Sequence, residues 1–168
     1  MILSVRAPFA FPYGGGYTWY DIDAVGTPEQ TMFKSSYDKL TMFIEDALKA
    51  YPIDQSRILL LGFSMGTVMS YSLALTMPEL FRGVVANSGY IPEGTHLTLR
   101  WNDIAQLEFF VAHGTFDPVI PLTFGRRAKE LLIEAHASLT YKEYPMAHQI
   151  SEESLADFAA WINQRLDT

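Results

Sequence analysis

The 168-residue chain has the length of one domain, and its 49% hydrophobic and 14% aromatic content is ample for a single packed core. The formal net charge is −7, and no positive cluster is longer than Arg126-Arg127, so we expect no nucleic-acid partner. The absence of cysteine excludes disulfides, a cysteine nucleophile and thiolate metal sites.

Short apolar runs alternate along the chain with longer segments of helical period, which is the pattern of a parallel sheet with crossover helices. The candidate strands are Ile2–Val5, Arg57–Leu61, Gly83–Ala86, Glu108–His113 and Leu139–Glu143. The candidate helices are Thr31–Ala50, Thr67–Met77, Phe124–Ala135 and Glu152–Leu166. Two segments fit neither period, the Gly- and aromatic-rich Pro8–Thr27 and the polar Pro92–Asp103. The prediction is one α/β domain over residues 1–168, with a mostly parallel sheet of about five strands.

The first residues, Met1–Arg6, lack a basic stretch that precedes a long apolar run. No later segment reaches the roughly 18 consecutive apolar residues that a membrane-spanning helix needs. We therefore expect a cytoplasmic protein that does not insert into membranes.

A G-x-S-x-G motif, residues 62–66, directly follows the second predicted strand and precedes a helix-forming stretch. This is the context of a nucleophile elbow, in which the serine occupies a strained turn and the glycines let strand and helix approach. Ser64 is then the candidate nucleophile, and the backbone N–H of Met65 is the candidate oxyanion donor. The simpler interpretation is an ordinary serine in a glycine-flanked turn. The position between strand and helix favours the elbow.

A serine nucleophile needs a base and an acid, which follow it in the order Asp or Glu, then His, in this fold class. His148 lies between the last predicted strand and helix, at the carboxyl end of a strand, where open α/β sheets build their sites. Asp117 follows the preceding strand, so its carboxylate can accept the His148 N–H and orient the other ring nitrogen toward Ser64. Taken alone, Asp117 is more simply a turn or helix-capping residue, because Asp-Pro is a frequent turn pair; the presence of Ser64 and His148 favours the triad. Asp103 is the reserve candidate for the acid.

The other histidines are less suitable as the base. His113 ends a strand, and the best acid follows it rather than precedes it, so we expect a structural role. His96 lies in the polar segment, and His136 lies near the end of a predicted helix, where it is a solvated or capping residue.

Three blocks in order, residues 62–66, 111–121 and 144–150, resemble the signature blocks of the phospholipase/carboxylesterase family of α/β-hydrolases. The similarity runs from about Arg6 to Trp161. It implies a triad of Ser64, Asp117 and His148 and hydrolysis of short-chain carboxylic esters, or sometimes acyl thioesters or lysophospholipids, without a cofactor or metal. The stretch from Arg6 to Asp21 resembles the family's approach to the substrate cleft.

The chain departs from the family pattern in two ways. The family usually has glutamine at Met65 and glycine at Ala147, and neither change removes a catalytic group. The family also begins with further strands and a His-Gly loop that supplies the second oxyanion donor, so we expect a shortened α/β-hydrolase fold. Tyr13–Gly16 is then the one flexible segment expected nearby to offer that donor. Either Ile2–Val5 pairs with Arg57–Leu61, or an open sheet edge recruits a second copy, and we expect a homo-oligomer.

The absence of a long insertion between strands predicts a pocket for short acyl chains. The candidate wall residues are Phe63, Phe116, Met146 and Trp19, and ordinary core packing is the alternative for each. The alternative to an active esterase is a weak or inactive hydrolase that serves as a binding or scaffold subunit, or a fragment. A dinucleotide site is disfavoured, because Gly14–Gly16 lacks the G-x-G-x-x-G spacing. A metal hydrolase is disfavoured because no His and carboxylate pairs fall at ligand spacing.

Overall fold

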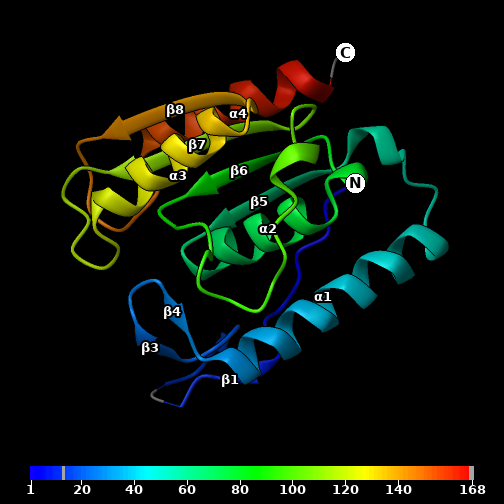
Figure 1. Cartoon of the computed structure of the whole chain (residues 1–168), viewed down its shortest axis with the longest axis horizontal. Coiled ribbons are helices and arrows are strands. Elements are labelled where there is room, and N and C mark those ends of the chain that lie inside the picture. Colours follow the sequence, from blue (N-terminus) through cyan, green and yellow to red (C-terminus); the bar gives the residue numbers. More distant parts are fainter. Residues whose placement is uncertain (13, 167–168) are drawn as a thin grey trace.

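A parallel four-stranded sheet forms the centre of the computed structural model, which describes residues 1–12 and 14–166 (Figure 1). Its strands, in spatial order, are β5 (Leu59–Phe63), β6 (Gly83–Asn87), β7 (Glu108–Gly114) and β8 (Ser138–Tyr144). Strands pair in chain order, with Phe63 opposite Asn87 at the carboxyl end. Because β6 is fully buried, its run of apolar residues reads as continuous rather than alternating. The predicted α/β class with a parallel sheet is confirmed.

Helices cover both faces of this sheet (Figure 1). They are α1 (Gln30–Ala50), α2 (Met65–Thr76), α3 (Leu122–Glu134) and α4 (Glu152–Leu166). On one face, apolar residues of α1, α2 and α3 form the main core with alternate strand residues such as Val84 and Phe109. On the other face, Phe158 and Trp161 of α4 pack against Val85 and Phe110. Among the described residues, no helix is both long enough and apolar enough to span a membrane.

The boundaries of the elbow strand and helix differ from those predicted. A 3₁₀ turn, Gln55–Arg57, precedes β5, with the Asp54 carboxylate accepting a 3.0 Å hydrogen bond from Ser56 N–H. The strand therefore starts at Leu59 and runs to Phe63. Only Ser64 separates the strand from the helix.

The Gly- and aromatic-rich segment that fits neither period forms two short hairpins. The first pairs β1 (Phe9–Ala10) with β2 (Tyr17–Thr18), and the second pairs β3 (Ile22–Ala24) with β4 (Thr27–Pro28). Both lie beside the amino end of α1 (Figure 1). Strands of two or three residues have little periodicity, so no strand pattern was detectable in the sequence.

The strand expected at Ile2–Val5 does not form, and this prediction is wrong: the sheet has four strands rather than five. Ile2 is 94% exposed. Leu3 and Val5 instead line a cavity of about 530 Å³ together with Ile44 of α1 and Leu60 of β5. The apolar side chains of this segment line a cavity, although its backbone pairs with no strand. An apolar run of this kind therefore has the composition of a strand without forming one.

Candidate active site

Ser64 occupies the sharp turn between β5 and α2, with φ 54° and ψ −121°, which is strained for a residue with a side chain. Its N–H donates a 3.0 Å hydrogen bond to the Asn87 carbonyl at the end of β6. A Cβ on Gly62 would lie 2.4 Å from the backbone of Gly66, so only glycine fits there. A Cβ on Gly66 would contact nothing within 4 Å outside its helix. Strand and helix therefore meet at the first glycine of the motif.

The three predicted triad side chains lie within hydrogen-bonding distance of one another. The Oγ of Ser64 is 3.0 Å from Nε2 of His148, and Nδ1 of His148 is 2.8 Å from Oδ2 of Asp117. A carboxylate accepts hydrogen bonds, so Nδ1 carries the proton and Nε2 is left to accept the one from Ser64. The arrangement is that of a serine nucleophile, a base and an orienting acid.

Asp117 is held in place through its second oxygen. Its Oδ1 accepts hydrogen bonds from the backbone N–H groups of Val119 and Ile120, at 2.8 and 2.9 Å. Burial by itself raises the pKa of this carboxyl, but the hydrogen bonds from His148, Ile120 and Val119 outweigh burial and lower the pKa below its usual value. Asp117 therefore stays ionised, although its side chain is 0% exposed.

A close backbone contact positions the loop that carries His148. A Cβ on Gly114, at the end of β7, would lie 2.3 Å from the Met146 carbonyl and 2.4 Å from the Ala147 carbonyl. The loop after β8 therefore packs directly on the Gly114 backbone. The Phe63 ring lies 4.8 Å from the His148 ring between centroids. Both contacts restrict the imidazole.

His113 is buried beside Asp117. Its Nε2 lies 2.8 Å from the Ile120 carbonyl, which can only accept, so Nε2 carries the proton. The same nitrogen is 3.7 Å from Oδ2 of Asp117. This contact supports the turn that holds Asp117, as expected for a structural histidine.

The backbone N–H of Met65 is the first of α2, so no carbonyl one turn earlier in the helix can accept it. The Met65 sulfur accepts a hydrogen bond from the Thr18 hydroxyl at 3.4 Å, which places the β1–β2 hairpin beside the elbow.

In the segment expected to supply a second oxyanion donor, Tyr13 lies outside the described residues. At Gly14–Gly16, added Cβ atoms would contact nothing within 4 Å.

The four candidate wall residues are not gathered in one pocket. Phe63 contacts the His148 ring. Phe116 is 71% exposed, Met146 is buried against α4, and Trp19 is partly buried against the main core. The reserve acid Asp103 pairs with Arg100 on the surface, at 2.9 Å.

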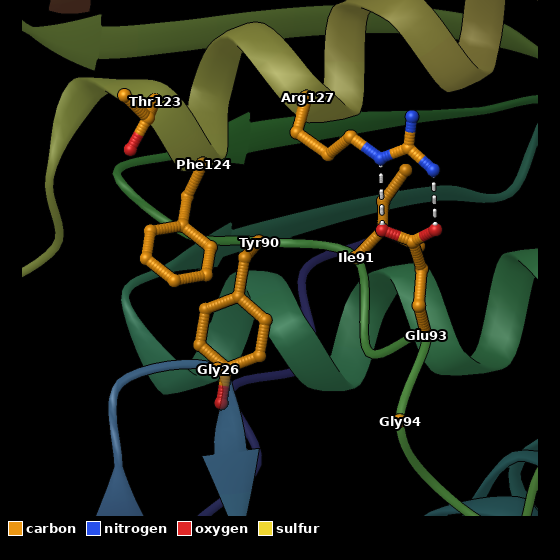
Figure 2. A pocket seen from close by; sticks show the side chains of 8 residues that line it. All are labelled: Gly26, Tyr90, Ile91, Glu93, Gly94, Thr123, Phe124 and Arg127. Carbon is orange, nitrogen blue, oxygen red and sulfur yellow. Dashed lines mark hydrogen bonds and ion pairs between the residues drawn. The ribbon is translucent and has the colours of Figure 1, made fainter.

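A pocket of about 230 Å³ lies among segments that follow the carboxyl ends of β6 and β7 (Figure 2). Its lining residues are Gly26, Tyr90, Ile91, Glu93, Gly94, Thr123, Phe124 and Arg127. The rings of Tyr90 and Phe124 lie 5.5 Å apart between centroids. Sequence reasoning missed these residues. Apart from Gly26, which lies in the turn between β3 and β4, their one signal is a position in the segments that follow two predicted strands.

Comparison with known proteins gives consistent results. A family model described as Phospholipase/Carboxylesterase matches residues 3–166. Acyl-protein thioesterase 1 of Candida albicans is 31% identical over 170 residues, covering 95% of this chain and 71% of that protein. The protein of the same name from Debaryomyces hansenii is 33% identical over 163 residues, covering 90% and 70%.

Solved structures share the fold at lower sequence identity. The Bacillus cereus carboxylesterase superposes with a TM-score of 0.82 at 22% identity, over 95% of this chain and 73% of that one. A carboxylesterase from Mesorhizobium loti gives a TM-score of 0.81 at 19% identity, over 94% and 73%. The four-stranded sheet and its helices thus have the arrangement seen in α/β-hydrolases.

Proposed function

Because the chain belongs to the phospholipase/carboxylesterase family and is an esterase-type hydrolase, we propose that it cleaves short-chain carboxylic esters through an acyl-enzyme formed on Ser64. The observation that carries this proposal is the hydrogen-bonded chain from Ser64 through His148 to Asp117. A binding or scaffold subunit would not require this chain of contacts.

The proposed reaction has two half-reactions. His148 Nε2 takes the Ser64 proton as Oγ attacks the ester carbonyl carbon, and the Met65 N–H stabilises the oxyanion that forms. The C–O bond to the alcohol breaks, and the alcohol leaves with the proton from His148. Water then attacks the acyl-enzyme with His148 again as base. The bond from the acyl carbon to Oγ breaks, Ser64 regains its proton from His148, and the carboxylic acid departs. Ionised Asp117 stabilises the imidazolium in both half-reactions.

The pocket between Tyr90 and Phe124 is the proposed site for the acyl group. Its volume of about 230 Å³ is below the roughly 300–1,000 Å³ of pockets for drug-sized ligands, which favours a short chain. The wall that bears Phe124 follows the Asp117 loop in sequence, and the wall that bears Tyr90 follows a residue packed against the elbow. Gly89, directly before Tyr90, packs so closely that a Cβ there would lie 3.0 Å from the Ser64 carbonyl.

Acyl thioesters form a second candidate substrate class, because two relatives are named acyl-protein thioesterase 1. The same nucleophile and base serve both reactions, which differ only in the leaving group. Rates with an oxygen ester and a thioester of the same acyl group would rank the two classes.

A direct test uses the four-carbon p-nitrophenyl ester with Ser64→Ala and wild-type protein. Loss of hydrolysis in the variant, with thermal unfolding unchanged, is the expected result. Wild-type rates in Ser64→Ala would overturn the proposal. A sixteen-carbon ester cleaved as fast as the four-carbon ester would overturn the short-chain assignment.

We also propose that the protein is a homo-oligomer in which a second copy covers the β5 edge. Among the described residues, β5 pairs only with β6. Leu61 on this strand is 52% exposed, and the adjoining cavity of about 530 Å³ is lined mainly by apolar residues. An open apolar edge is a template for strand pairing. Sedimentation as a stable monomer would refute this assembly.

A further inference from the structure

A two-point ion pair joins opposite walls of the Tyr90–Phe124 pocket (Figure 2). Arg127 of α3 donates from Nε to one oxygen of Glu93 at 3.1 Å and from Nη2 to the other at 2.8 Å. Glu93 lies on the loop that follows β6. A guanidinium and a carboxylate held by two parallel hydrogen bonds have a fixed relative orientation. The pair therefore ties this loop to the helix.

Along α3, the ion pair lies further from the amino end of the helix than Phe124 does. Phe124 is in the first turn of α3, shortly after the loop that carries Asp117. Arg127 is three residues further on, which is close to one helical turn. On this wall, the aromatic ring thus comes before the charge along the chain that follows Asp117.

The opposite wall has the same order. Gly89 packs against the Ser64 carbonyl, Tyr90 follows it, and Glu93 lies three residues beyond. Figure 2 shows the Tyr90 ring beside Phe124 at one end of the pocket and Glu93 with its partner at the other. On both walls, the chain that leaves a triad segment therefore reaches an aromatic residue before a charged one.

On the basis of the proposed ester hydrolysis, we propose that the Arg127–Glu93 ion pair closes the outer end of the pocket and sets the longest acyl group that the site accepts. A short acyl chain ends against the Tyr90 and Phe124 rings. A longer chain must displace the pair or bury it under methylene groups, and both deprive charged groups of favourable contacts.

Removing the pair leaves the fold intact, because its side chains are 49% and 42% exposed and exposed ion pairs add little to stability. The chain also offers a matched control. Arg126, the preceding residue of α3, makes a two-point pair with Glu143 of β8, at 2.9 and 3.0 Å, and neither residue lines the pocket. Loss of that pair removes an equal charge from the same helix turn.

The experiment compares kcat/KM for eight-carbon and four-carbon p-nitrophenyl esters. In Arg127→Ala, the ratio of the two values should rise about fourfold for each further methylene that the opened pocket buries. Arg126→Ala should keep the wild-type ratio. Exchanging the charges, with Arg127→Glu and Glu93→Arg together, should restore the wild-type ratio. If the rise in Arg127→Ala came only from lost packing, the exchanged pair would not restore the ratio.

An unchanged ratio in Arg127→Ala, with the four-carbon ester still hydrolysed, overturns this inference and leaves the proposed function standing. An equal rise in Arg126→Ala also overturns it, because the effect would then be a general loss of charge. If Arg127→Ala does not fold, Arg127→Lys replaces it, since lysine keeps the charge but not the two-point contact. Wild-type protein that hydrolyses neither ester overturns the proposed function and this inference together.

Discussion

Replacing Asp117 with asparagine tests whether the acid fixes the protonation of His148. Oδ1 accepts two backbone N–H groups, at 2.8 and 2.9 Å, so the asparagine carbonyl oxygen must take that position. The asparagine NH₂ group then occupies the Oδ2 position, 2.8 Å from Nδ1 of His148. Because NH₂ only donates, Nδ1 must accept, and the ring proton moves to Nε2. In that tautomer, Nε2 of His148 donates toward Ser64 and cannot accept the proton of the Ser64 hydroxyl.

The expected loss of kcat is about 10⁴-fold, the loss that the same exchange causes in a serine protease triad. This corresponds to about 5 kcal/mol at 1.36 kcal/mol per tenfold. The KM should change little, because Asp117 does not line the pocket. Initial rates with the four-carbon p-nitrophenyl ester measure both parameters, and thermal unfolding checks that the variant is folded. A kcat within tenfold of wild type would refute the assignment of Asp117.

Three further outcomes follow from the same geometry. Gly114→Ala should reduce kcat about 100-fold or more, as a displaced catalytic group does, because the added Cβ would displace the loop that carries His148. The control is Gly66→Ala, where an added Cβ contacts nothing within 4 Å outside its helix. Equal rates for the two variants would contradict the prediction. The lowered pKa of Asp117 stabilises the fold above the unfolded pKa, about 3.9, and this contribution is lost as pH falls through the folded pKa. The melting-temperature difference between wild type and Asp117→Asn should therefore shrink below about pH 4, and a constant difference would exclude this linkage. Leu61→Lys should yield monomers by sedimentation, because a charge on an edge strand opposes pairing, and oligomers that persist would point to another interface.

Chain order and local patterns sufficed for most of the fold. The helix at Glu152–Leu166 forms with the predicted bounds, because its apolar stripe and flanking residues act locally. Ile2–Val5 shows the limit of such patterns: an apolar run indicates burial, whereas strand formation requires a neighbour that pairs with it. The two short hairpins were missed for the related reason that they are too short to have a period.

The three candidate triad residues could be selected from sequence because each follows a strand end, and parallel strands bring these ends together. The pocket could not be identified in that way. Met146 lies in the loop that carries His148, yet its side chain packs on the α4 side of the sheet with Phe158. Tyr90 and Phe124 meet only because β6 and β7 are neighbours in the sheet. Which face a side chain takes after a strand ends is decided by tertiary packing.

Mass spectrometric mapping of a fluorophosphonate adduct is the most direct test of the central claim, that Ser64 is the activated nucleophile. Serine attack on the phosphorus requires the same base as attack on an ester. We expect one adduct, on Ser64, that is absent in Ser64→Ala and forms much more slowly in His148→Ala. Labelling of a different residue, or labelling of Ser64 at an unchanged rate without His148, would contradict it.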